Sequence, residues 1–192
     1  QTLAMPALAL TDQMNFCGLV RFYSTAHEAG IKPIVGVDCY VLHPLFGAES
    51  SRMLLLAADN TGYQNLSQLI SKAYLRGHVD GKPQIEHDWL AEYSQGIIVL
   101  SGGKDGLLGK ALLKENQQSV NELLAFYQQH FANRFYLELL RTGRPDAGRT
   151  RRQNAATARR PWGSDNGAGQ ERSMVKSPLD TQREDVNICP EV

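Results

Sequence analysis

Residues 5–41, MPALALTDQMNFCGLVRFYSTAHEAGIKPIVGVDCYV, carry the pattern that decides the fold. The continuous apolar run at residues 7–10 is typical of a strand that is covered on both faces. Residues 15–29 then carry a broad apolar face at helical spacing, and Gly30 follows where a helix would end. A second buried strand is expected at residues 34–41. Strand, helix and strand in this order predict a right-handed crossover between parallel strands.

The alternation continues along the chain to about residue 146. Further strands are expected at residues 53–58, 97–100 and 135–140, and further helices at residues 63–73, 88–92, 107–113 and 119–131. This order predicts an α/β fold with a parallel sheet or a β/α barrel. In either architecture the ligand site lies at the carboxyl ends of the strands, so the residues at those ends are the candidates for function.

Composition limits the function classes. The 192 residues include 20 Lys+Arg and 20 Asp+Glu, so the net charge is zero and no overall basic field attracts nucleic acid. The cysteines at positions 17, 39 and 189 lack the spacing of a zinc site or a disulfide framework. We therefore expect a cytoplasmic protein in which Cys17 and Cys39 are small core residues. No apolar run approaches the roughly 20 residues that would span a bilayer.

The two ends of the chain differ from its middle. The chain opens directly on a buried strand, and we expect it to begin inside a longer gene product. Residues 147–192 hold few large apolar side chains and an arginine cluster, made up of Arg149, Arg151, Arg152, Arg159 and Arg160. Such a segment buries too little surface to offset its chain entropy, so we expect a disordered tail.

Two carboxylates stand out as candidate site residues. Asp12 follows the first strand, where it would act as a metal ligand or general base, or alternatively as a helix N-terminal residue or turn former serving backbone donors near residues 15–17. Asp38 lies inside an apolar strand, which is costly unless the charge is paired or solvated. Pairing with Arg52 and binding of a metal both explain it.

Other polar residues give weaker signals. Ser101, Gly102, Gly103 and Lys104 follow a strand and form a weak phosphate-binding candidate, because they lack the full spacing of a P-loop. The histidines lie on a helix, at helix ends or in loops, and we interpret each as a surface residue; they are His27, His43, His78, His87 and His130.

Four stretches in register resemble a known family. Beside residues 5–41 these are LLLAADNTGYQNLSQLISKAYLRG (54–77), GIIVLSGGKDGLLGKALL (96–113) and RFYLELLRTGRPD (134–146). They resemble the PHP (polymerase and histidinol phosphatase) domains of bacterial DNA polymerase III alpha subunits. The resemblance implies an incomplete distorted β/α barrel at residues 1–146, with the first and last strands missing, whereas residues 147–192 do not match the family.

The resemblance also implies a degenerate metal site. In metal-binding members the first strand ends in Thr-Asp-His, and Gln13 stands in place of that histidine. In their Gly-x-Glu motif, Asp38 stands in place of the glutamate. Histidine positions of the family fall at Arg52 and Thr142, and a permanent cation such as arginine repels a metal. We therefore expect a vestigial pocket of Asp12, Gln13, Asp38, Arg52 and Thr142 that binds no metal.

For function, the resemblance implies a fragment of a DNA-directed DNA polymerase of chromosomal replication. The polymerase aspartates, the Mg²⁺ that they bind and most DNA contacts would lie outside this chain. The fragment would be a catalytically inactive PHP domain that braces the polymerase and docks the proofreading exonuclease subunit, beside other holoenzyme subunits, with no membrane partner. The alternatives are a metal-dependent PHP-type phosphoesterase or pyrophosphatase, and a phosphate-binding module.

Overall fold

The computed structural model describes residues 5–139 and 175–176. The expected disordered tail lies outside the described residues, apart from β10 (Val175–Lys176), which pairs in parallel with β9 (Glu138–Leu139). Within the described residues the fold is a mixed α/β structure whose strands form an open sheet rather than a closed barrel.

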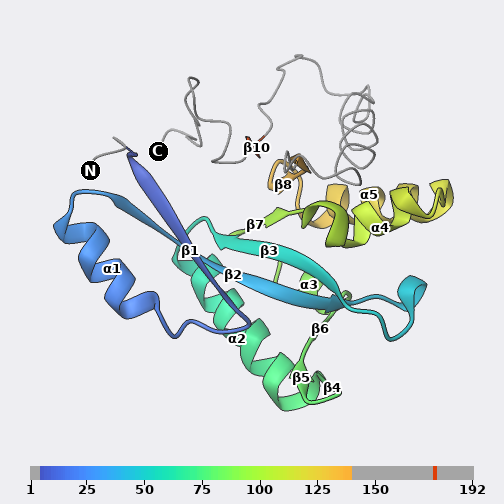
Figure 1. Ribbon diagram of the computed structural model, residues 1–192, viewed down its shortest axis with the longest axis horizontal. Helices are drawn as coiled ribbons and strands as arrows, with labels where there is room; N and C mark the ends of the chain where they lie inside the picture. Colours follow the sequence, from blue (N-terminus) through green and yellow to red (C-terminus); the bar gives the residue numbers. More distant parts are fainter. Residues whose placement is uncertain (1–4, 140–174, 177–192) are drawn as a thin grey trace.

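One sheet organises the described part of the chain (Figure 1). Its strands lie side by side in the order β1 (Ala7–Gln13), β2 (Lys32–Leu42), β3 (Ser51–Ala57), β7 (Ile97–Leu100) and β8 (Phe135–Tyr136), and β6 (Ile85–Glu86) pairs with the end of β2. β1 and β2 are parallel and are joined by α1 (Leu19–Glu28), which confirms the expected strand, helix and strand unit. β7 and β8 are parallel too.

β3 differs from the expected parallel arrangement, because it runs antiparallel to both β2 and β7. The chain between β2 and β3 contains only the short 3₁₀ turn η1 (Pro44–Phe46). A parallel connection needs a crossover of a dozen or more residues, whereas a short turn returns the chain antiparallel. The first residues of β3 therefore lie at the same edge of the sheet as the last residues of β2.

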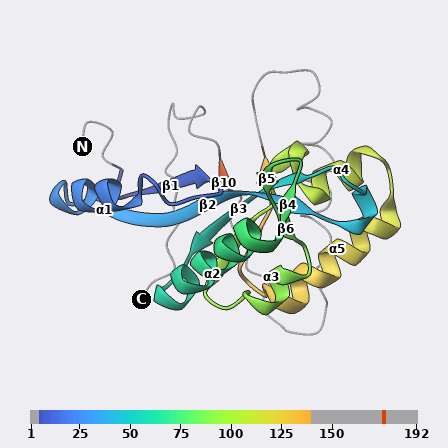
Figure 2. The same cartoon turned by 90° about the horizontal axis from the view of Figure 1, so that it is seen from below.

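Helices cover the sheet and close the core. Beside α1 they are α2 (Asn60–Arg76), α3 (Trp89–Glu92), α4 (Leu107–Leu113) and α5 (Gln117–His130), with the 3₁₀ turn η2 (Gly103–Asp105) before α4 and the small hairpin of β4 (His78–Val79) and β5 (Lys82–Pro83) after α2. Figure 2 shows α2, α3 and α5 on one side of the sheet. Fully buried side chains such as Leu55, Leu66 and Leu123 form one continuous core between them. Across the described residues, none of the helices is long and apolar enough to cross a membrane.

Gly62 and Gly96 allow the start of α2 to pack directly against the backbone just before β7. A Cβ atom on Gly62 would lie 1.9 Å from the carbonyl oxygen of Gly96, so no side chain fits there. Asp59 caps the helix by accepting a 2.8 Å hydrogen bond from the Gly62 N–H. Backbone contact and cap together hold α2 in place over β3 and β7.

Candidate functional site

The sheet edge where β2 ends and β3 begins holds an ion pair. Arg52 Nε donates to Asp38 Oδ1 at 3.3 Å, and the Arg52 Nη2 atom donates to the other carboxylate oxygen, Oδ2. The Asp38 side chain is only 10% exposed and the Arg52 side chain 53%. The hydrogen bond to Asp38 raises the pKa of Arg52 above its usual value, so the guanidinium is a permanent cation. The charge of Asp38 therefore has an arginine as its partner.

Gln13 and Tyr40 extend this cluster. Gln13 lies opposite Asp38 in the parallel register, and Tyr40 lies opposite Arg52 in the antiparallel register. The Gln13 Nε2 atom donates to the Tyr40 hydroxyl oxygen at 2.8 Å. Registered partners point to the same face of a sheet, so Gln13, Asp38, Tyr40 and Arg52 share one face. The structure thus brings together three of the residues expected from sequence and adds Tyr40.

Asp12 contacts the start of α1, which is the alternative to metal binding that the sequence offered. It precedes Gln13 in β1 and therefore points to the opposite face of the sheet. Its Oδ2 atom accepts a 2.8 Å hydrogen bond from the Gly18 N–H, just before α1 begins. This contact provides an acceptor for one of the N–H groups at the start of the helix that have no partner within the helix. Thr142, the fifth residue of the expected pocket, lies outside the described residues.

The turn after β7 holds a further carboxylate. The Gly102 N–H donates to Glu138 Oε2 at 2.6 Å, the Gly103 N–H donates to the same side chain, and the Glu138 N–H donates to Ser101 Oγ at 3.0 Å. Lys104 follows in η2. Burial raises the pKa of Glu138, and the negative charge of Asp38 adds to this, whereas the turn N–H groups and Arg52 lower it.

Glu138 was not a candidate from the sequence, although a signal existed. It lies inside the apolar stretch 135–140, much as Asp38 lies inside its own strand. A carboxylate in such a run needs a partner. The same argument that singled out Asp38 would have found Glu138.

The histidine assignment was wrong for His87. Its side chain is 3% exposed, and its ring centroid lies 4.1 Å from that of Phe126 and 4.5 Å from that of His43. Its Nε2 atom has no hydrogen-bond partner among the described residues. Burial, followed by the nearby His43 and His130, lowers the pKa of His87 to about 3. The short strand β6 delivers His87 into the core next to α5, which no periodicity in the sequence indicated.

The two cysteines among the described residues differ in their exposure. Cys39 is buried, as expected, but Cys17 is exposed and is not a core residue. Within residues 5–139, no group of three or more His, Cys, Asp or Glu side chains is arranged to hold a metal ion.

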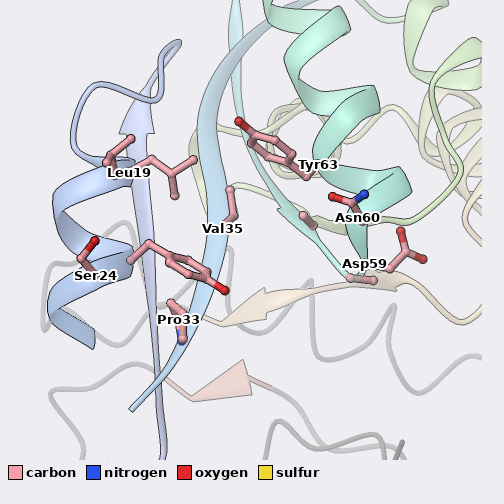
Figure 3. A pocket seen from close by; sticks show the side chains of 11 residues that line it. Leu19, Ser24, Pro33, Val35, Asp59, Asn60 and Tyr63 are labelled. Atoms are coloured by element: carbon pink, nitrogen blue, oxygen red, sulfur yellow. The ribbon is translucent and has the colours of Figure 1, made fainter. Parts of the chain in front are cut away.

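A groove of about 450 Å³ lies at the other end of β2 (Figure 3). Leu19 and Ser24 of α1 form one wall, Pro33 and Val35 of β2 form the floor, and Tyr63 of α2 lies on the other side. The groove and the Asp38 cluster are therefore separate features of the sheet.

Comparison with known proteins shows which family the chain resembles. The PHP domain family matches residues 1–142. The chain is 59% identical over 144 residues to DNA polymerase III subunit alpha of Vibrio cholerae, and 56% identical over 144 residues to that of Escherichia coli K12, which is 75% of this chain in both cases. It is 44% identical over 142 residues to the subunit of Pseudomonas aeruginosa, 74% of this chain. The chain spans 12% of the length of each of these relatives.

Proposed function

This chain belongs to the PHP domain family, and on that premise we propose that it is part of a replicative DNA polymerase III alpha subunit in which the PHP domain has lost its metal chemistry. In that role the domain stabilises the polymerase and docks the proofreading exonuclease subunit. DNA synthesis, with its Mg²⁺, and the main DNA contacts then belong to other parts of the longer subunit, which works in the cytoplasm.

The observation that carries this proposal is the contact between Asp38 and Arg52. A divalent metal at this sheet edge needs Asp38 as a free anionic ligand. Arg52 instead donates two hydrogen bonds to that carboxylate and places a fixed positive charge beside it. A metal ion would have to displace the guanidinium and then overcome its repulsion. The residues present therefore do not fit a metal ion while Arg52 holds Asp38.

The net charge supports a docking role over direct DNA binding. Equal numbers of acidic and basic residues give the chain no overall field toward a polyanion. A protein interface needs a stable folded surface, and the continuous core of the described residues provides one.

The test is a pull-down of the full chain with the purified proofreading exonuclease subunit. We expect specific binding that is unchanged by a chelator such as EDTA, because the interface does not depend on a metal. A chain carrying Arg52→Lys, which keeps the positive charge beside Asp38, serves as the matched control and should bind equally well. Absence of binding by the folded chain contradicts the docking role.

Elemental analysis decides between this proposal and the alternative metal-dependent phosphoesterase. We expect the purified protein, after dialysis against buffer with zinc and manganese, to retain neither metal in stoichiometric amount. One or more equivalents of either metal, with hydrolysis of a phosphate ester, would establish the phosphoesterase instead.

A further inference from the structure

The turn Ser101–Gly103 binds a carboxylate of its own chain. Gly102 and Gly103 have φ angles of +73° and +58°, and the N–H groups of both donate to the Glu138 side chain. Backbone concavities in which successive N–H groups point at one acceptor bind phosphate and carboxylate oxygens alike. The turn therefore has the donor arrangement of an anion receptor, and Glu138 fills it.

The receptor is built rigidly into the sheet. A Cβ atom on Gly102 would lie 2.1 Å from the carbonyl oxygen of Arg52, so the turn packs directly on the start of β3. The Ser101 hydroxyl accepts from the Glu138 backbone, which ties the turn to the strand beyond β8. Such packing keeps the N–H groups oriented even when the carboxylate is absent.

Two charges flank the receptor, and both influence Glu138. Arg52 favours an anion there, whereas Asp38 opposes it. Because Arg52 is already paired with Asp38, the turn N–H groups supply most of the attraction for any anion that enters. Removal of the Glu138 carboxylate frees these donors and removes one negative charge at the same time.

We propose that the Ser101–Gly103 turn is an anion-binding site that Glu138 keeps closed, and that it accepts a phosphate group once this carboxylate is removed. The proposal does not rest on exonuclease binding, and its test stands or falls independently of that binding. It also gives the Ser101–Lys104 stretch a defined ligand class and explains how the native chain excludes that ligand.

The experiment compares the parent chain with Glu138→Ala, each labelled with ¹⁵N and titrated with inorganic phosphate. We expect saturable shifts of the Gly102 and Gly103 amide resonances in E138A and an apparent affinity at least about tenfold above that of the parent chain, a difference of about 1.4 kcal/mol. Glu49→Ala is the matched control. It removes a carboxylate that pairs with Lys110 rather than with backbone N–H groups, so it should behave like the parent.

A second variant, Glu138→Gln, keeps a side-chain oxygen for the Gly102 N–H and so preserves the fold if E138A does not. It is expected to bind phosphate more tightly than the parent and more weakly than E138A. A short oligonucleotide in place of inorganic phosphate tells free phosphate from nucleic-acid phosphate, and its monoanionic diesters should shift the same amides less. Folded E138Q with unshifted Gly102 and Gly103 amides, or shifts as large in the parent chain, overturns the proposal.

Discussion

Acid should destabilise this protein through His87. The unfolded chain binds a proton at this residue with an ordinary pKa of 6.5, whereas burial holds the pKa at about 3 in the folded chain. The unfolded state therefore binds more protons below pH 6.5, so the His87 contribution is complete above pH 6.5 and is lost as the pH falls toward 3. A pH of 4.5 lies about two units below the ordinary pKa of 6.5. The free energy of unfolding is therefore lower there by about 3 kcal/mol, at 1.36 kcal/mol for each unit.

The perturbation is His87→Phe, which keeps an aromatic ring against Phe126 and Tyr127 and removes the unpartnered Nε2 atom. The free energy of unfolding is measured by urea denaturation, followed by circular dichroism, at pH 7.5 and pH 4.5. We expect the parent chain to lose about 3 kcal/mol more than H87F over this interval. His43 and His130, which face the same ring, remain in both chains and cancel in the comparison.

The matched control is His27→Gln, since His27 lies on the exposed face of α1. Its pH dependence should equal that of the parent chain. Equal losses of stability in the parent and H87F between the two pH values refute the reasoning, because they show that His87 accepts its proton without a cost to the fold.

Three further predictions concern stability and are measured by urea denaturation at pH 7.5. Arg52→Met leaves Asp38 buried without its partner and should cost about 2 kcal/mol, whereas Glu92→Gln, which breaks the exposed pair with Lys72, should cost less than about 1 kcal/mol; equal costs contradict the importance of the Asp38 pair. Gly62→Ala should cost more than about 3 kcal/mol through its clash with Gly96, against about 1 kcal/mol for Gly81→Ala, which has a positive φ but open space around it. Asp12→Ala should cost about 1 kcal/mol by removing the acceptor of the Gly18 N–H, and Asp12→Asn should recover most of this loss.

Apolar periodicity predicted the elements of this fold well. The strand at residues 97–100 and the helix at residues 107–113 agree with β7 and α4 at both ends, because each is a mainly apolar segment bounded by glycine or polar residues. Periodicity carries no strand direction, and so the reversal of β3 was missed. The short connection between β2 and β3, with Pro44 and Gly47, was the available signal.

The candidate site was predicted less completely. A charge inside an apolar strand demands a partner, which left pairing with Arg52 and metal binding open for Asp38, and the structure shows the pair with Arg52. Asp12 lies on the other face of the sheet, and strand alternation alone would have separated it from Gln13. His87 could not be placed, since its burial depends on contacts with Phe126 and Tyr127 of α5, which are distant in sequence.

The antiparallel return of β3 affects how this protein folds. Asp38 and Arg52 are separated by 14 residues, so their pair forms within a hairpin and closes a short loop. The Gly102 contact with Glu138 joins residues separated by 36 positions. Because the entropy lost on loop closure rises with loop length, the hairpin pair is the less costly contact to form first. A chain emerging from the ribosome can thus neutralise Asp38 before Gly102 and Glu138 have been synthesised.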